Sequence, residues 1–297
     1  MSGPVSGIID FRIGVPYRAT AADPPVEITG KLARYNDLYS VADSFNWTMD
    51  DLLAEMEAAG VERAVLHAEY AHGEPAVWNR KTAEAVARYP DRFVGIGTVD
   101  PADSRSAVSE AKRCFDEYGF LGINLQPCVS GVPANDRRSY LVYAVVLDRG
   151  GVVTTHTGVN FFAQSPIRLG HPLDVCDVAC DLPDLKIVAC HGGWPWADEL
   201  AAVAWKHPNV YVDFGAISPK YLLRGDTGYG VAWNLANGQF ADRLLFGTDW
   251  PTISLTRVVR ELADRGLTPE THPNFFAGNT ARLLGLDLGN GAGDGGG

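Results

Sequence analysis

Short apolar runs alternate with longer amphipathic stretches along almost the whole chain. The short runs are rich in β-branched residues and lack the regular polar alternation of a half-exposed sheet. This pattern is typical of parallel strands that are buried on both faces. It predicts strands at 7–11, 63–67, 93–97, 121–125, 152–156, 186–190, 210–214 and 244–248.

Amphipathic helices are expected between these strands. The clearest begins at Thr48, where Thr48 and Asp51 resemble a capping box, and it extends to Gly60. Other helices are predicted at 76–88, 105–118, 139–148, 196–206 and 255–265. Repeated β/α units without a flexible linker favour an α/β fold, a single-domain (β/α)8 TIM barrel over residues 1–286. A doubly wound sheet is the alternative, but polar strand ends recur along the whole chain rather than at one switch point.

Two segments depart from the repeating pattern. Residues 16–47 form a long insertion after the first strand, and we expect them to contribute to the mouth of the barrel. Residues 287–297 are rich in glycine and have almost no apolar surface to bury, so they are expected to be disordered.

Three predicted strands end in side chains that can perform chemistry. His156 and His191 end two of them, and Asp249 follows a third. In a TIM barrel the carboxyl ends of the strands meet at one mouth, so these residues are candidate catalytic groups of a single site. Two imidazoles and a carboxylate could also bind zinc or manganese and activate a water molecule.

Other polar and aromatic residues are predicted near the same mouth. Arg12 follows the first strand, where it could bind a substrate carboxylate or form a salt bridge with Asp10 or Glu69. Glu69 and His72 follow the second strand and could supply a ligand or an acid. Further candidates for substrate binding are Asn124, Arg168, Trp194 and Trp250.

Charge and cysteine content narrow the possible partners. The formal net charge of −11 argues against nucleic acid or an anionic membrane surface as a partner, while a small-molecule substrate fits. No apolar run is long enough for a membrane span, and no secretory signal is evident. Five cysteines suit reduced thiols in the cytoplasm. Cys176 and Cys180 lie four residues apart, but without a nearby second pair they are interpreted as small packing residues rather than metal ligands.

Several motifs together resemble the amidohydrolase-related family that includes aminocarboxymuconate-semialdehyde decarboxylase, γ-resorcylate decarboxylase and related hydrolases. The matching segments, which extend over about residues 7–286, are 49–65, 93–101, 122–127, 156–158, 191–193, 247–251 and 278–284. The resemblance implies a distorted TIM barrel. It also implies that His156 and Asp249 bind one divalent metal ion, usually zinc or manganese, and that His191 assists as an acid, a base or a polarising group.

The first strand departs from the pattern of that family. Where the family has Asp-x-His-x-His, or Glu before a single His, this chain reads Asp10-Phe11-Arg12-Ile13-Gly14. Two interpretations remain open. Either a weakly bound metal is held by His156 and Asp249 with help from His191 or Glu69, or the barrel works without metal and Arg12 supplies the positive charge. We lean towards a site that is free of metal or only weakly metallated, because zinc sites normally have three or four protein ligands.

The sequence therefore predicts a cytoplasmic small-molecule enzyme. The preferred reaction is hydrolysis of a C–C, ester, thioester or amide bond in a carbonyl compound that bears a carboxylate or an aromatic ring. In it, Asp249 or His156 would activate water, and His191 or Arg12 would stabilise the oxyanion. The alternatives are nonoxidative decarboxylation, with Asp249 protonating the carbon, and a catalytically silent barrel that binds a ligand. A homodimer is also expected to be possible.

Overall fold

Eight parallel strands form the centre of the protein. The structure is a computed structural model, and it describes residues 7–41, 43–69 and 74–287. The strands are neighbours in chain order, from β1 to β8, as in the TIM barrel that the sequence predicts. They are β1 (Ile8–Gly14), β2 (Val61–His67), β3 (Phe93–Thr98), β4 (Gly122–Leu125), β5 (Val152–His156), β6 (Lys186–Cys190), β7 (Val210–Asp213) and β8 (Leu244–Leu245).

Contacts between the first and last strands close the ring. The backbone N–H of Phe11 donates to the carbonyl of Phe246 at 2.8 Å, and Ile13 forms a parallel bridge with Trp250. Strand β8 is shorter than the predicted 244–248, because the chain continues beside β1 through these isolated contacts rather than in a regular ladder.

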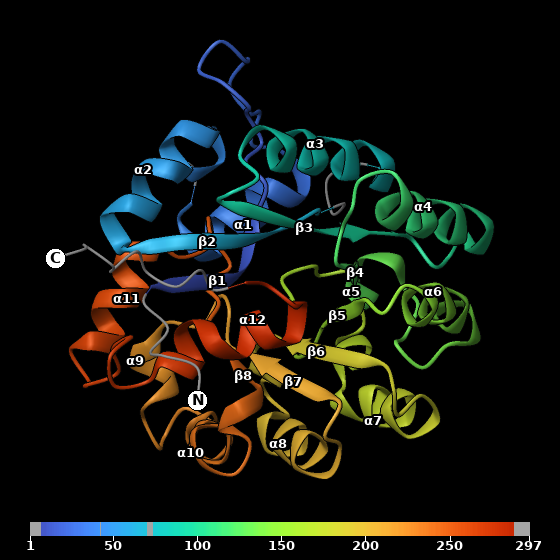
Figure 1. Ribbon diagram of the computed structural model, residues 1–297, viewed down its shortest axis with the longest axis vertical. Coiled ribbons are helices and arrows are strands. Elements are labelled where there is room, and N and C mark those ends of the chain that lie inside the picture. The colour runs from blue at the N-terminus through green and yellow to red at the C-terminus, as the bar shows by residue number, and fades with distance from the viewer. Residues whose placement is uncertain (1–6, 42, 70–73, 288–297) are drawn as a thin grey trace, which may run out of the picture.

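Helices surround the strands on the outside (Figure 1). Their apolar faces and the outward faces of the strands share one large hydrophobic core, to which α2 contributes Leu52 and Met56. The helices are α1 (Gly30–Tyr39), α2 (Met49–Ala59), α3 (Pro75–Arg88), α4 (Ser104–Asp116), α5 (Pro127–Ser130), α6 (Arg137–Asp148), α7 (Pro172–Asp181), α8 (Ala197–Lys206), α9 (Pro219–Leu222), α10 (Gly230–Gly238), α11 (Leu255–Ala263) and α12 (Asn279–Leu284).

A smaller apolar cluster fills the inside of the barrel. Phe11, Val65, Ile96 and Val188 belong to it, and Leu283 of α12 packs against them. Helix α12 lies across the end of the barrel that faces the viewer in Figure 1. Apolar side chains therefore fill the end of the barrel that α12 covers. The cavity described below opens at the opposite end.

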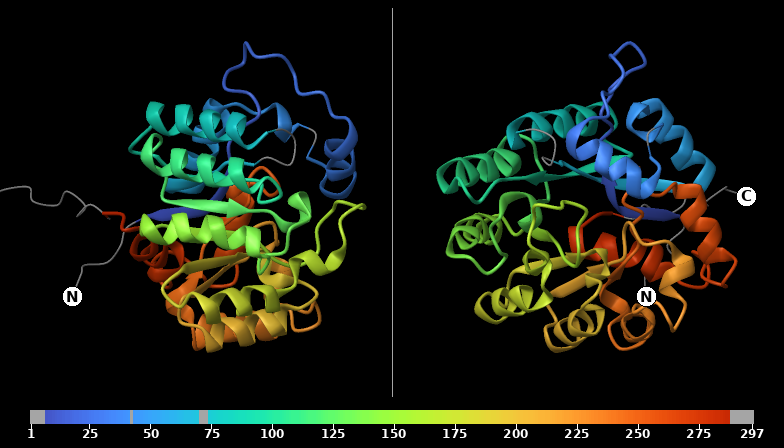
Figure 2. Two further views of the ribbon diagram at one scale, coloured as in Figure 1. Left: turned by 90° about the vertical axis from the view of Figure 1, so that its right-hand side faces the viewer. Right: turned by 180° about the vertical axis from the view of Figure 1, so that it is seen from behind.

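The insertion after β1 lies at that opposite end, as Figure 2 shows. It contains α1 and a short 3₁₀ turn at Ser44–Asn46. The Tyr35 ring of α1 contacts Phe161, which follows β5, with 4.6 Å between ring centroids. Tyr35 of the insertion thus lies at the mouth, where it lines the cavity described below.

Some expectations lie outside the described residues, namely those for His72 and for the glycine-rich tail from 288 onward. Among the residues that the structure does describe, no helix has both the length and the apolar character needed to cross a membrane.

Candidate active site

Arg12 lies at the floor of the mouth because of an irregularity in β1. The pairing of β1 with β2 shifts register between Asp10 and Ile13, and Arg12 lies within this shift. An extra residue of this kind redirects a side chain locally, as bulges near active sites commonly do. Room for the Arg12 stem is left by Gly215 and Gly247, where an added Cβ would lie 3.4 Å from Arg12 Cδ and 3.3 Å from Arg12 Cβ respectively.

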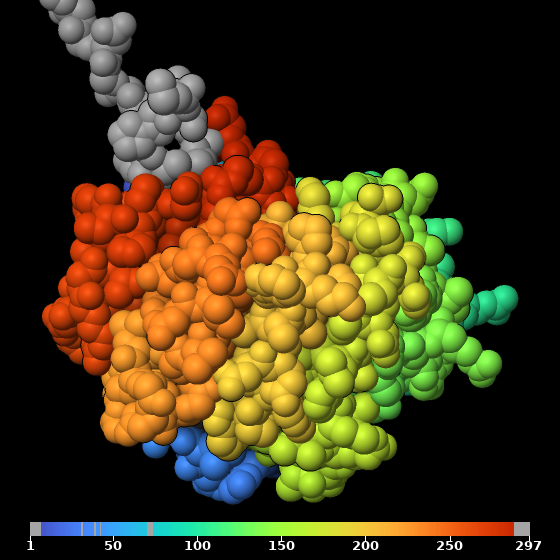
Figure 3. Space-filling view, turned by 90° about the horizontal axis from the view of Figure 1, so that it is seen from below, coloured from blue at the N-terminus to red at the C-terminus, as the bar shows by residue number. Residues whose placement is uncertain are grey.

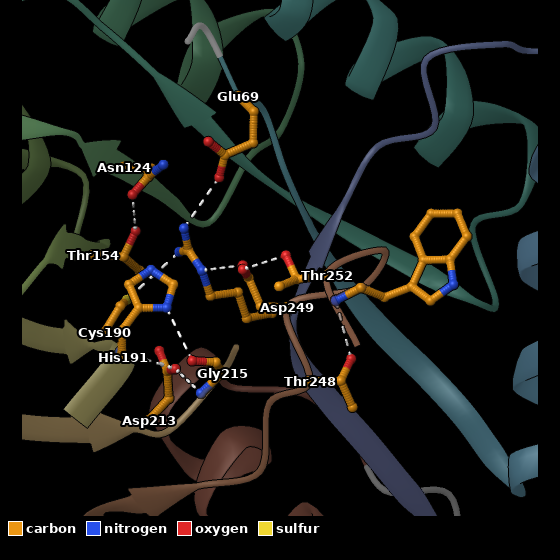
Figure 4. A network of polar contacts seen from close by, with 12 residues as sticks. Glu69, Asn124, Thr154, Cys190, His191, Asp213, Gly215, Thr248, Asp249 and Thr252 are labelled. Carbon is orange, nitrogen blue, oxygen red and sulfur yellow. Dashed lines mark hydrogen bonds and ion pairs between the residues drawn. The ribbon is translucent and has the colours of Figure 1, made fainter. Parts of the chain in front are cut away.

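The guanidinium of Arg12 joins two carboxylates. Its Nε donates to Asp249 Oδ1 at 2.8 Å, and its Nη2 donates to Glu69 Oε1 at 3.1 Å. Figure 4 shows Glu69, Asp249 and Cys190 arranged around the same point. Arg12 is only 3% exposed, and burial by itself would lower its pKa. The surrounding Cys190, Asp249, Glu69 and Asp213 outweigh burial and raise the pKa, so the group remains a fixed positive charge.

The carboxyl group of Glu69 has a pKa close to neutral pH. Burial raises the pKa of Glu69 to about 7, although Arg12 and a hydrogen bond from Gln126 act in the opposite direction. Its Oε2 accepts that bond from Gln126 Nε2. A carboxyl group with this pKa can both donate and accept a proton at physiological pH.

Asp249 is presented by a turn with an unusual backbone. Its φ of 60° lies in the left-handed region, which aspartate tolerates better than most residues. Its backbone N–H donates to the carbonyl of Arg12 at 2.8 Å, which fastens the turn to β1. The second carboxylate oxygen accepts from Thr252 Oγ1 at 3.0 Å. Both oxygens of Asp249 are therefore oriented by the protein.

His191 and His156 lie side by side at the same mouth, with 4.7 Å between ring centroids. Burial lowers the pKa of His191 to about 3 and lowers the pKa of His156 well below its usual value. His191 Nδ1 lies 3.0 Å from the carbonyl of Gly215, which can only accept, so the tautomer with a proton on Nδ1 is assigned. Nε2 of His191 is then a hydrogen-bond acceptor. Nε2 of His156 has no partner among the described residues.

Buried polar groups support the site from below. Asp10 accepts from Thr248 Oγ1 at 2.6 Å and from the backbone N–H of Arg12 at 2.9 Å, and burial raises its pKa to about 7. Asp213 accepts from the N–H of Gly215 at 2.7 Å, which positions the carbonyl that faces His191. Asp10 and Asp213 therefore position the residues that line the cavity and do not line it themselves.

A cavity of about 640 Å³ opens above this floor. Seven of the predicted site residues line it: Arg12, Glu69, His156, His191, Trp194, Asp249 and Trp250. Trp250 is stacked on Trp47 with 5.5 Å between ring centroids. Tyr35, Phe161 and Phe162 add further aromatic wall. A mostly apolar cavity with a few convergent polar groups is typical of a small-molecule site.

Two predicted binding residues do not reach the cavity. Asn124 is fully buried below it, where its Oδ1 accepts from Thr154 Oγ1 at 2.9 Å. Side chains two residues apart on a strand share a face, and Gln126, one step nearer the mouth, takes the position expected for Asn124. Arg168 is exposed on the 3₁₀ turn Ile167–Gly170 and does not line the cavity.

Sequence reasoning missed the cations at the rim. Lys220 of α9 and Arg257 of α11 both line the cavity. Neither follows a strand directly, and the sequence analysis looked for polar residues at the carboxyl ends of predicted strands. That criterion could not identify them. Arg257 is partly engaged by Glu261, with 2.8 Å between Arg257 Nε and Glu261 Oε1.

The residues at the mouth do not fit a divalent metal ion. The Arg12 guanidinium occupies the space between Asp249 and Glu69, and its fixed charge would repel a cation bound to either carboxylate. Within the described parts of the chain, the cluster whose ligand atoms lie close enough together for a metal is Cys176, Cys180 and His207, which is elsewhere. Zinc or manganese bound by His156, Asp249 and His191 is therefore not supported by this geometry.

Comparisons with known proteins agree with the fold and the motifs. The chain matches the amidohydrolase family over residues 36–286. It is 25% identical to a 2-amino-3-carboxymuconate-6-semialdehyde decarboxylase from Dictyostelium discoideum, over 70% of this chain and 66% of that protein. It is 22% identical to a gamma-resorcylate decarboxylase from Rhodococcus jostii, over 70% of this chain and 75% of that one.

Solved structures resemble the whole barrel. An uncharacterised TIM-barrel protein from Bordetella bronchiseptica is 28% identical, with a TM-score of 0.74 over 95% of this chain and 99% of that one. A 5-carboxyvanillate decarboxylase from Novosphingobium aromaticivorans, which contains manganese, is 16% identical with a TM-score of 0.67 over 96% and 98% of the two chains. The second likeness shows the fold alone. With the family match extending over most of the barrel, the chain belongs to the amidohydrolase family of enzymes.

Proposed function

We propose that this protein is a metal-independent decarboxylase of an aromatic or unsaturated carboxylic acid. The observation that carries the proposal is the Glu69–Arg12–Asp249 array at the floor of an aromatic-walled cavity. The sequence alone placed hydrolysis first. The names of the similar proteins support its alternative, decarboxylation, better.

The cavity suits a flat, anionic substrate. Tyr35, Phe161 and Trp194 offer faces against which a ring or a conjugated chain can pack. Lys220 at the rim supports binding of a carboxylate, and Arg12 at the floor supports binding of a second oxygen function. A neutral apolar substrate would make no use of these two positive charges.

Arg12 takes the charge role in this proposal. Loss of carbon dioxide breaks the bond between the substrate carbon and its carboxylate, and the electron pair stays on the substrate. A carbonyl or phenol oxygen conjugated to that carbon would accept the charge, and the guanidinium would stabilise it. Arg12 donates to Asp249 through Nε, to Glu69 through Nη2 and to Cys190 Sγ through Nη1. Each Nη atom carries two N–H groups, so one N–H on each remains for the substrate.

Glu69 then supplies the proton. Its acid form protonates the carbon that lost the carboxylate, and the carboxylate of Glu69 recovers a proton from solvent. One proton is consumed and one carbon dioxide is released per turnover. The sequence analysis gave the protonation to Asp249. We assign it to Glu69 because burial brings the pKa of this group to about 7.

Hydrolysis is the second candidate, and His191 favours it. With its Nδ1 facing the carbonyl of Gly215, Nε2 can accept a hydrogen bond from water. Asp249 would then be the base that activates this water molecule. Metal-bound hydroxide has no part in this version, because Arg12 occupies the space between the carboxylates.

An assay in D₂O separates these reactions. The full-length protein would be incubated with hydroxybenzoates and unsaturated dicarboxylic acids, and released carbon dioxide and product deuteration would be measured. Decarboxylation places deuterium on the carbon that lost the carboxylate. A parallel set of esters, thioesters and amides reports hydrolysis as acid release. Hydrolysis without any decarboxylation would refute the proposal, and binding of these acids without turnover would support a silent barrel.

Substitution of Glu69 tests the proton donor. Because general acid catalysis contributes about 10²- to 10⁴-fold, E69Q is expected to lower kcat by that amount with little change in KM. D249N, which disturbs the orientation of Arg12, should affect kcat and KM together. A fully active E69Q protein would exclude Glu69 as the acid.

A further inference from the structure

Two cysteines and a histidine meet on the outer surface of the barrel. Cys176 and Cys180 belong to α7, and His207 follows the last residue of α8. His207 Nε2 lies 3.3 Å from Cys176 Sγ and 3.8 Å from Cys180 Sγ. The three ligand atoms all lie within 4.8 Å of one another. We call these three residues the Cys–His cluster.

Helix geometry explains why the two thiols face His207. Residues four apart lie on one face of a helix, and α7 packs against α8. The neighbouring acids are turned towards other partners. Asp177 accepts from Asn135 Nδ2 at 2.8 Å, and Asp181 accepts from Tyr140 Oη at 2.6 Å. The face towards α8 is thus formed by sulfur ligands.

The spacing of the cluster matches a tetrahedral metal site. Zinc lies about 2.3 Å from thiolate sulfur and about 2.0–2.1 Å from imidazole nitrogen, which places sulfur and nitrogen about 3.6 Å apart in a tetrahedron. The two measured sulfur–nitrogen distances, 3.3 and 3.8 Å, lie on either side of this value. Little movement would be needed to accept the ion.

The backbone that carries His207 is held firmly. The carbonyl of His207 accepts from Arg243 Nη1 at 2.8 Å, and the same nitrogen donates to the carbonyls of Ala204 and Val210. His207 is 8% exposed, and burial together with nearby Lys206 lowers its pKa. The imidazole is therefore presented to the two thiols from a fixed backbone position.

The cluster is accessible and separate from the mouth. Cys180 is exposed, so an ion can enter from solvent. Figure 3 shows the face on which the yellow-green segment of α7 and the gold segment of α8 lie together. The residues that line the mouth cavity include no member of the cluster.

We propose that Cys176, Cys180 and His207 bind a thiophilic divalent cation, with zinc as the best match. Both thiols release their protons to solvent on binding, so the occupied site carries no net charge. Three protein ligands leave the fourth position to water. Soft sulfur ligands disfavour manganese and magnesium, which prefer oxygen.

Cobalt titration of the full-length protein tests this proposal. Metal would first be stripped with a chelator, in the presence of a phosphine reductant that keeps the thiols reduced. The wild-type protein is expected to bind one Co²⁺ with the thiolate-to-cobalt charge-transfer bands of a tetrahedral sulfur site. Zinc should displace the cobalt and raise the Tm, because binding to the native state alone stabilises it.

Matched variants locate the ion. C180S and H207N are expected to abolish the charge-transfer bands and to weaken zinc binding at least tenfold. D249N at the mouth and H272N at another surface histidine should retain the bands. Cys180 is exposed, so C180S is expected to fold, which its thermal unfolding would verify. Wild-type protein without thiolate bands, or C180S protein that keeps them, would overturn the proposal.

Discussion

The positive charge at the floor of this barrel is a side chain, and its chemistry differs from that of a metal ion. The Arg12 guanidinium is planar and donates in fixed directions to Asp249 and Glu69. It cannot generate hydroxide from bound water, as zinc does. It can hold two carboxylates and stabilise a developing negative charge in the same plane. A single residue therefore changes which reactions the mouth can support.

Restoring the family's histidines tests this view of Arg12. The double variant R12H/G14H recreates Asp-x-His-x-His, and we expect it to gain one zinc or manganese ion at the mouth, measured by elemental analysis in a C180S background. R12K keeps a positive charge and should gain none. Adding D249N to the double variant should remove the gain. Gly14 leaves limited room, because an added Cβ would lie 3.3 Å from the carbonyl of Trp250.

The pKa of Glu69 predicts the pH dependence of turnover. Burial raises this pKa to about 7, so the acid form predominates below pH 7 and disappears above it. If the acid form protonates the substrate, kcat is constant below that pH and falls about tenfold per unit above it. The residual activity of E69Q should lack this limb. A rate that rises through pH 7 would instead indicate that Glu69 acts as a base.

Individual site residues were predictable where a strand ends in a polar side chain. His156, His191 and Asp249 all line the cavity, because strand ends in a barrel converge. Asn124 was expected at the mouth but lies below the cavity, because the sequence pattern does not reveal which residue of a strand is the first to reach the mouth. Lys220 and Arg257 belong to helices rather than to strand ends, and no local signal marks them. The catalytic and binding roles proposed for all of these residues remain predictions.

At the scale of elements, the entry to α2 joins the insertion to the barrel. The backbone N–H of Thr48 donates to Asp51 Oδ2 at 2.8 Å, and the backbone N–H of Asp51 donates to Thr48 Oγ1 at 3.4 Å. The capping box that the sequence indicates at this helix is present in the structure. It begins a helix whose Glu55 accepts from Trp250 Nε1 at 2.8 Å, so it also supports the mouth.

Removing this cap should destabilise the protein modestly. T48A is expected to lower the free energy of unfolding by about 0.5–2 kcal/mol, as measured by urea denaturation. D50N, a change at an exposed acid in the same helical turn, serves as the control and should have a smaller effect. A T48A protein as stable as the wild type would show that packing of α2 alone fixes its start.

Elements were predictable when their hydrophobic period was clear. Strands β5 and β6 have the predicted bounds, because glycines directly precede β5 and closely follow β6. Helix α10 was not among the predicted helices. A helix around Cys176 and Cys180 was expected, but its bounds were not, because α7 begins with a proline inside a long stretch after β5. The Cys–His cluster was missed for a related reason, because 27 and 31 residues separate His207 from the two cysteines. Only the packing of α7 on α8 brings them together.

At the scale of the whole molecule, metal removal should leave turnover intact. A metal that contributes about 3 kcal/mol to the transition state would cost about a hundredfold in rate when removed. We expect no such loss of kcat/KM after chelator treatment, although zinc leaving the Cys–His cluster should lower the Tm. Added manganese should not increase the rate. A chelator-sensitive rate that manganese restores would contradict the metal-independent assignment.

The barrel itself could be predicted because apolar strands and amphipathic helices alternate regularly along the chain. Each parallel strand is covered on both sides, so its sequence is apolar throughout and the repeat of strand and helix stands out. Closure could not be read directly, since it depends on contacts between Phe11 and Phe246 at opposite ends of the chain. The polar strand ends that recur along the whole chain favoured a barrel over an open sheet, and the family resemblance agreed with this.

The salt-bridged Arg12 also affects how the active form of such an enzyme would be produced in the cell. A guanidinium that belongs to the polypeptide cannot dissociate from the protein, and no competing ion or chelator can replace or remove it. Each newly synthesised barrel would be competent as soon as folding ends. Starvation for manganese or zinc would then leave this step of metabolism running while chemically similar steps elsewhere in the cell stop.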